Sequence, residues 1–255
     1  MEAFKKYLYE LGYSQQTINT YCYAVSYFFR QFKDITTDNL LAWKKLLIKE
    51  KRSPQTINVR LQGLRHYSTF LGETKKVAFV RIPKRVFLND VLTMEEYLHL
   101  LNCLKKNSKT SWYFLVKFLA CTGARVSEVL KFTSEHVKQG YMDVYGKGTK
   151  QRRIWIPQSL RNEALTWDRV GKLWSWRIGS IGNALRRFGR LYGVNPQHLH
   201  PHAFRHFYAR MFYKETKDIQ LLSNLLGHTS INTTMIYLLQ TNLEITQEIN
   251  STVTW

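Results

Sequence analysis

The chain has 255 residues, of which 44% are hydrophobic, enough for one large globular domain or two smaller domains with real cores. Its 38 Lys and Arg residues exceed its 18 Asp and Glu residues by a net charge of +20, so nucleic acid is the first candidate partner and a membrane surface the second. Residues 1–90 hold 16 basic and 7 acidic residues, a net +9, and residues 91–255 hold 22 and 11, a net +11. This even spread excludes a neutral protein with one basic tail.

Cysteine content and hydropathy indicate the cellular compartment in which the protein is expected. Cys22, Cys103 and Cys121 form no Cys-x-x-Cys pair, which argues against a disulfide framework or a zinc ribbon and favours a reducing cytosol. The N-terminus lacks the apolar core of a signal peptide, and the most apolar run, 112–121, is too short to span a bilayer and contains Lys117. The sequence therefore predicts a soluble intracellular protein with no membrane partner.

Residues 1–72 are expected to form a helical N-terminal domain. Apolar residues recur at helical spacing in three stretches: 17–32, 40–48 and 57–71. Ser14 and Ser53 begin two similar segments and are candidate N-caps, with Pro54 at the first helical position of the second. Gly72 is expected to end the last of these helices.

Residues 73–92 interrupt this pattern and are interpreted as a basic linker. Charge runs are most often solvated loops, but this one could also lie along DNA phosphates. The candidate phosphate contacts are Lys75, Lys76, Arg81, Lys84 and Arg85.

A second domain is expected over residues 93–255. Thr93 and Glu96 form a capping-box pattern, which predicts a helix start. Alternating residues over 141–145 and 152–156 flank a Gly-rich turn and predict a β-hairpin, and helical patterns fill most of the rest. The predicted fold is therefore mainly α with one small antiparallel sheet, arranged as two domains.

Two candidate functional clusters lie in the first half of this domain. Gly123 is expected to end one helix and Arg125 to begin the next, with Glu128 on the same helical face. This pair is either a surface ion pair or an arginine fork for phosphate that is steadied by a carboxylate. Lys147 lies between two glycines in the hairpin turn, where a ligand could approach closely, although exposed hairpin lysines are common.

A third cluster places His202 and Arg205 three residues apart, on one face of a helix. A metal site is the obvious alternative because His198, His200 and His206 lie nearby. However, no Cys or carboxylate is close in sequence, and a central arginine would repel a cation, so no metal is expected.

The fourth cluster runs from Leu225 to Tyr237. Gly227 is expected to end a helix before His228, Ser230 or Thr229 can cap the next helix, and Tyr237 follows about two turns later. A single tyrosine on an amphipathic helix is usually a core or interface residue, so Tyr237 alone does not indicate chemistry.

The order Arg, Lys, His-x-x-Arg, Gly-His, Tyr resembles the tyrosine recombinase family, the lambda-integrase class, over residues 93–237. In size the chain is most similar to compact Xer-type and mobile-element recombinases, and residues 1–72 more vaguely resemble their core-DNA-binding domain. Phe204 stands where Leu is common in this family and can fill the same buried space. The resemblance implies these roles: Tyr237 as nucleophile, Arg125 and Arg205 as the phosphate clamp, His202 in proton movement, Lys147 as general acid, His228 in the phosphate-binding shell and Glu128 as support.

The family's chemistry suits these groups. Tyrosine is a weak nucleophile because its unperturbed pKa is about 10, and nearby cations favour the phenolate while stabilising charge on the phosphate oxygens. The resemblance implies a covalent 3′-phosphotyrosine intermediate, four protomers on double-stranded DNA with inverted-repeat core sites, and strand exchange through a Holliday junction. It requires no metal or cofactor. It also implies that the tail after Tyr237 docks on a neighbouring protomer, although this tail could equally be a frayed terminus. The expected location is the cytoplasm, at the nucleoid.

Three alternatives remain open. A type IB topoisomerase-like enzyme shares the chemistry but relaxes supercoils as a monomer. A catalytically silent DNA-binding protein could share the fold, and a metal-dependent nuclease could use the histidine cluster. The target sequence, any accessory protein and the choice among integration, excision, inversion and dimer resolution are not readable from the residues.

Overall fold

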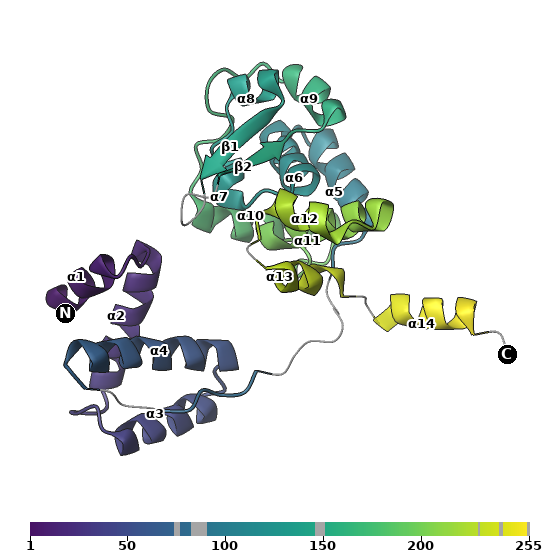
Figure 1. The fold of residues 1–255 in the computed structure, drawn as a ribbon. Helices are drawn as coiled ribbons and strands as arrows, with labels where there is room; N and C mark the ends of the chain where they lie inside the picture. The colour runs from purple at the N-terminus through teal and green to yellow at the C-terminus, as the bar shows by residue number, and fades with distance from the viewer. Residues whose placement is uncertain (74–76, 83–90, 146–150, 229, 240–241, 254–255) are drawn as a thin grey trace. The chain divides into compact units, whose positions relative to one another are not determined.

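The computed structural model describes residues 1–73, 77–82, 91–145, 151–228, 230–239 and 242–253. The chain divides into two compact units, Met1–Lys84 and Arg85–Trp255, called here the N-terminal and C-terminal units (Figure 1).

The described residues of the N-terminal unit form four helices. They are α1 (Glu2–Glu10), α2 (Gln15–Phe29), α3 (Thr37–Lys49) and α4 (Pro54–Phe70). Ser14 and Ser53 cap α2 and α4, since each side chain accepts a hydrogen bond from the backbone N–H three residues later. α2 and α4 approach closely at Gly63, where a Cβ atom would lie 3.1 Å from the Cα of Tyr21. The helical N-terminal region that the sequence predicts is therefore present, with an aromatic-rich core that includes Phe4, Phe28 and Trp43.

Residues 77–82 pack on the N-terminal unit, which differs from a freely solvated linker. The Asn58 side chain and the Val80 backbone exchange two hydrogen bonds of 2.9 and 2.8 Å, and Lys44 donates to the carbonyl of Ala78 at 2.6 Å. Val77 and Val80 also pack against the apolar core. Because these two valines lie among basic residues, an interpretation based on charge did not predict that this segment packs on the N-terminal unit.

The first described helix of the C-terminal unit, α5 (Met94–Lys106), begins at the predicted capping box. The Thr93 hydroxyl accepts from the Glu96 N–H at 3.2 Å, and the Glu96 carboxylate accepts from the Thr93 N–H at 3.1 Å. The elements in order are α5 (Met94–Lys106), α6 (Thr110–Thr122), α7 (Val126–Val129), α8 (Ser134–Gln139), β1 (Tyr141–Tyr145), β2 (Gln151–Trp155), α9 (Gln158–Leu165), α10 (Ile178–Tyr192), α11 (Pro201–Thr216), α12 (Ile219–Leu226), α13 (Ile231–Met235), the 3₁₀ helix η2 (Ile236–Leu238) and α14 (Asn242–Thr252).

Helix α6 forms the centre of the C-terminal core, and α5, α7, α9 and α11 all pack against it (Figure 1). The two strands are antiparallel, with Met142 opposite Ile154 on the buried face. The hairpin contacts α8 through β1 and α12 through β2, so it lies next to the segment that leads to Tyr237. The fold is mainly helical with one small antiparallel sheet, as the sequence predicts.

Candidate active site

The turn between α6 and α7 presents Arg125. Gly123 ends α6 with φ of 61°, a left-handed conformation that favours glycine. A Cβ atom at Gly123 would lie 2.4 Å from the Tyr208 ring of α11, so the aromatic ring occupies the space that a side chain would need. Arg125 is the N-cap residue of α7, and its side chain is 48% exposed. Glycine and the Tyr208 ring thus fix the backbone immediately before an accessible guanidinium group.

Arg205 connects three segments that are far apart in the sequence. It lies on α11 and is only 2% exposed. Its Nη1 donates to the Gly123 carbonyl at 2.7 Å, and its Nη2 donates to the Leu226 carbonyl at 2.7 Å and to His228 Nε2 at 2.9 Å. One guanidinium group therefore joins the turn before Arg125 to the end of α12. Burial, followed by the positive charge of Arg125, lowers the pKa of Arg205.

His228 follows Gly227, which ends α12 with φ of 66°. Because a guanidinium group only donates, His228 Nε2 must accept from Arg205, and the proton therefore lies on Nδ1. Nδ1 then donates to the Thr234 hydroxyl at 2.8 Å. Burial and the nearby charge of Arg205 lower the pKa of His228 to about 4. This histidine is neutral at pH 7, and both of its ring nitrogens have partners.

Tyr237 lies on η2 and is 6% exposed. Its hydroxyl is 3.3 Å from His202 Nε2. The ring stacks on His228, with 5.3 Å between centroids, and meets His206 edge-on at 4.2 Å. Burial and Arg205 lower the pKa of His202, so its imidazole is neutral at pH 7 and able to accept a proton. The Tyr237 hydroxyl is therefore directed at a basic nitrogen while its ring is held by two further imidazoles.

Glu128 lies between two arginines. It accepts from the Arg125 backbone N–H at 2.7 Å, from Arg125 Nη1 at 3.1 Å and from Arg152 Nη2 at 2.6 Å. Burial alone would raise the pKa of this carboxyl, but the charge of Arg152 and the bonds from Arg125 bring it below the usual value. Glu128 is thus an ionised carboxylate that fixes both arginines.

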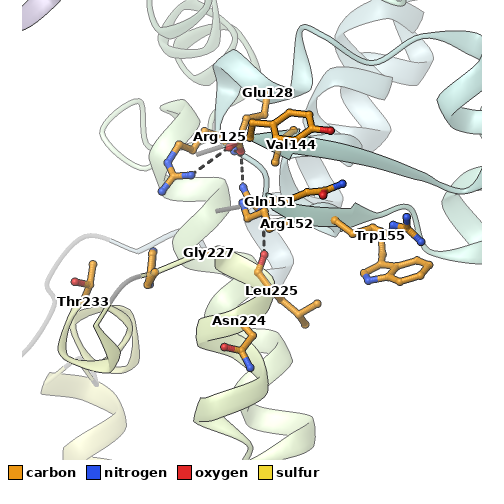
Figure 2. A pocket seen from close by; sticks show the side chains of 13 residues that line it. Arg125, Glu128, Val144, Gln151, Arg152, Trp155, Asn224, Leu225, Gly227 and Thr233 are labelled. Carbon is orange, nitrogen blue, oxygen red and sulfur yellow. Dashed lines mark hydrogen bonds and ion pairs between the residues drawn. The ribbon is translucent and has the colours of Figure 1, made fainter. Parts of the chain in front are cut away.

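A cavity of about 940 Å³ opens beside these groups (Figure 2). Its walls come from α7, the hairpin, the end of α12 and the start of α13, and they include Arg125, Glu128, Arg152, Gly227, His228 and Thr233. Three cationic side chains, those of Arg125, Arg152 and Arg153, therefore face a space large enough for a phosphate group.

The predicted site residues fall into three groups. Arg205, His228, His202 and Tyr237 form one contiguous set of contacts, and Arg125 with Glu128 adjoins it through the Gly123 turn. Arg81 is exposed in the N-terminal unit. The remaining predicted contacts lie outside the described residues: Lys75, Lys76, Lys84, Arg85 and Lys147.

Three contacts were missed by sequence reasoning. Arg152 is 13% exposed and binds Glu128, Thr234 binds His228, and His206 packs on Tyr237. Only Arg152 carried a usable signal. It shares the inward register of β2 with Ile154, and an arginine at an inward strand position is expected to have a partner.

Over the part of the chain that the structure describes, no three His, Cys, Asp or Glu side chains gather closely enough to hold a metal ion. Among those same residues, no helix combines the length and apolar character needed to cross a bilayer. The contacts around Arg205 and Tyr237 bring together a phenol, neutral imidazoles and guanidinium groups, which suits attack on a phosphodiester.

Comparisons with known proteins agree with this geometry. A model of the phage integrase family matches residues 179–243. The tyrosine recombinase XerA of Pyrococcus furiosus is 31% identical over 263 residues, covering 93% of this chain and 88% of the relative.

Two solved structures share the fold. The Tn1549 transposon integrase in complex with a circular intermediate DNA has a TM-score of 0.72 at 14% identity, covering 98% of each chain. The lambda integrase tetramer bound to a Holliday junction has a TM-score of 0.66 at 19% identity, covering 92% of this chain and 75% of that one. With the similarity to XerA along nearly the whole chain, the family indicated by the order of the motif residues is confirmed: this chain belongs to the tyrosine recombinases, the enzymes of site-specific DNA recombination.

Proposed function

We propose that this chain cuts and rejoins DNA through a covalent bond between the Tyr237 oxygen and a 3′ phosphate. The observation that carries the proposal is the set of contacts around Arg205, which joins the Arg125 turn to His228 beside a tyrosine whose hydroxyl meets His202. A structural tyrosine needs neither a basic nitrogen at its hydroxyl nor two guanidinium groups within electrostatic range of each other.

In the first step, Tyr237 Oη attacks the phosphorus and gives its proton to His202 Nε2. The bond from phosphorus to the 5′ oxygen breaks, and Lys147 supplies the proton that this leaving oxygen needs. In the second step, a 5′-hydroxyl of a partner strand gives its proton to Lys147 and attacks the phosphotyrosine. The bond from phosphorus to the Tyr237 oxygen breaks, and His202 returns its proton to the phenolate. The phosphodiester energy is kept in the covalent bond, so no other energy source is needed.

Arg125 and Arg205 stabilise the charge that builds on the non-bridging oxygens. The bonds to Gly123, Leu226 and His228 fix the Arg205 plane and leave N–H groups on Nε and Nη1 for an anion. Arg125 is accessible and has one described carboxylate partner, Glu128, so it can place a fork of donors on a phosphate. His228, with its neutral ring, completes the phosphate-binding shell.

The assembly follows from the same chemistry. We infer that four copies hold two duplexes at inverted-repeat core sites and exchange strands in pairs through a Holliday junction, as the lambda integrase tetramer is seen to bind one. Residues 1–72 act as the core-DNA-binding domain, residues 73–92 as a basic linker and residues 93–255 as the catalytic domain. The net charge of +20 predicts that DNA affinity falls steeply with added salt.

The test uses a nicked duplex built from the DNA that flanks the gene, from which the cut strand end diffuses away and traps the covalent complex. The full chain should form an adduct that peptide mapping places at Tyr237. Tyr237→Phe keeps the ring contacts with His206 and His228 and should lower adduct formation by at least about 10⁴-fold, as for removal of a nucleophile.

Tyr213→Phe is the matched control. Tyr213 also lies on the small core formed by α11, α12 and η2 but has no described contact with the site, so this variant should cleave as the parent chain does. An adduct that persists in Tyr237→Phe, or that maps to another residue, would overturn the proposal. DNA binding measured in parallel should be equal for all three proteins.

A further inference from the structure

Arg152 lies between two parts of the active site and is not part of the motif order Arg, Lys, His-x-x-Arg, Gly-His, Tyr. It is the second residue of β2, and its side chain is mostly buried. Nη2 donates to Glu128 Oε2 at 2.6 Å, and Nη1 donates to the Leu225 carbonyl in the last turn of α12 at 2.8 Å (Figure 2). The side chain thus joins the hairpin to both α7 and α12.

The space for this side chain depends on Gly227. A Cβ atom at Gly227 would lie 2.3 Å from Arg152 Cδ, so the arginine stem lies directly over the glycine backbone. The positive φ of Gly227 already requires glycine, and the close approach of Arg152 is a second, independent requirement. Gly227 and the Leu225 carbonyl therefore fix the guanidinium group in one position.

The fixed guanidinium group determines how Glu128 is used. Glu128 Oε2 is shared by Arg152 and the Arg125 backbone N–H, while Oε1 accepts from Arg125 Nη1. Without Arg152, the carboxylate would keep only donors from Arg125 among the described residues, and it would be free to turn with that exposed side chain. With Arg152 present, Glu128 is an immobile acceptor that restricts Arg125 to one orientation.

We propose that Arg152 is a positioning residue for DNA cleavage: it holds Glu128, and Glu128 aims the Arg125 guanidinium group at the scissile phosphate. The inference rests on the proposed function. Arg152 itself does not touch the phosphate, because its charge is engaged by Glu128 and its second nitrogen by Leu225.

The test compares Arg152→Gln with Lys117→Gln in single-turnover cleavage at saturating protein. Lys117 lies on α6, is not one of the residues that line the cavity and pairs with Glu163, so it matches Arg152 in charge, in burial and in having a carboxylate partner. We expect Arg152→Gln to lose about 10- to 100-fold in rate, the range for removal of a group that orients a ligating side chain. Lys117→Gln should stay within about twofold, because its pair joins α6 to α9 and has no described contact with the site. Arg152→Lys, which cannot reach both partners, should fall between the two.

A second substrate separates positioning from stability. A methylphosphonate at the scissile position replaces one charged oxygen by methyl and removes the charge that Arg125 neutralises. If Arg152 acts through Arg125, its loss should matter by about threefold or less on this substrate. An equal loss on both substrates, or no loss on either, would overturn the proposal.

Double variants test the route through Glu128. If Arg152 acts by holding that carboxylate, the double variant Arg152→Gln, Glu128→Gln should cleave no more slowly than the slower of the two single variants. This neutral pair also avoids an unpaired buried carboxylate, so it keeps the test valid if Arg152→Gln alone folds poorly. Additive losses would show that Arg152 acts independently of Glu128, contrary to the proposal. Absence of any adduct with the parent chain would instead contradict the proposed function.

Discussion

Among the described residues, each unit of this chain buries one arginine, and the two are held in different ways. Arg60 in the N-terminal unit is 9% exposed, and its guanidinium group lies 4.7 Å from the centre of the Tyr27 ring, with Nη1 making no hydrogen bond within the described chain. Arg205 in the C-terminal unit is 2% exposed and bonds to two backbone carbonyls and a histidine.

The difference shows what each arginine can do. An aromatic face accepts a cation from many orientations and is worth only about 0.5–2 kcal/mol. Backbone carbonyls at Gly123 and Leu226 accept only in a fixed geometry, so Arg205 also fixes the segments that carry them. Burial of charge in the N-terminal unit serves local packing, whereas in the C-terminal unit it assembles a site.

Among changes that compare the two units, the largest expected effect comes from replacing each buried arginine with lysine. Arg205→Lys keeps the charge but cannot reach three acceptors, so cleavage should fall by about 10²–10³-fold. The free energy of unfolding should fall by about 3 kcal/mol, because carbonyls and His228 are left without donors. Arg60→Lys keeps a cation over Tyr27 and should change stability by less than about 1 kcal/mol, with an unchanged cleavage rate. Denaturant titration and suicide-substrate cleavage measure both, and equal losses in the two variants would remove the distinction.

Two glycines with similar backbone angles sharpen the same comparison. Gly72 in the N-terminal unit has φ of 80° and open space where a Cβ would lie, so Gly72→Ala should cost only the strain of about 1–2 kcal/mol. Gly227 has φ of 66°, and a Cβ atom there would clash with Arg152. Gly227→Ala should therefore cause a similar strain and also lower the cleavage rate by about 10-fold or more. Thermal unfolding and single-turnover cleavage separate the two effects. A Gly227→Ala variant that cleaves normally would show that Arg152 can move without consequence.

The smallest effect is a difference in acid sensitivity. Burial and neighbouring charges lower the pKa of His206 to about 3 and that of His228 to about 4, from an ordinary 6.5. Between these values and 6.5, the unfolded chain binds protons that the folded chain does not bind. The free energy of unfolding is therefore highest above about pH 6.5 and falls as the pH decreases toward 4. Full linkage would give about 1.4 kcal/mol per pH unit for each of these two histidines. Because both rings are only half-buried and solvent screens part of the effect, we expect a slope of about 1 kcal/mol per pH unit for the C-terminal unit. The N-terminal unit holds one histidine, His66, and should respond less.

Tryptophan fluorescence can follow this difference, since six of the seven tryptophans lie in the C-terminal unit. Denaturant midpoints should fall between pH 7 and pH 5, and His228→Gln should reduce that fall more than His66→Gln does. A midpoint independent of pH would contradict the assignment of neutral buried histidines.

Local sequence was sufficient where a feature depends on neighbours in the chain. The capping box at Thr93, the hairpin and the helix ends at Gly123 and Gly227 are each determined by a few adjacent residues, and all were predicted. The pairing of Arg125 with Glu128 follows from helical spacing and was also predicted.

Features that depend on contacts between distant parts of the chain could not be predicted from the sequence. Nothing near Arg205 in the sequence indicates that its acceptors are the carbonyls of Gly123 and Leu226, because every residue carries a carbonyl. Arg152 resembled any charged hairpin residue until the register of β2 showed that it points inward. The packing of Val80 on Asn58 was hidden because the surrounding residues are basic.

The contacts of Arg205 also bear on when the protein becomes able to break DNA. Chains emerge from the ribosome N-terminus first, and Arg125 is made 112 positions before Tyr237. A nascent chain that ends before α12 has neither the Leu226 carbonyl nor His228 to orient Arg205, and it lacks the tyrosine altogether. Such a fragment carries much of the positive charge that attracts DNA but lacks the proposed nucleophile, so incomplete synthesis should yield a chain that binds DNA without cutting it.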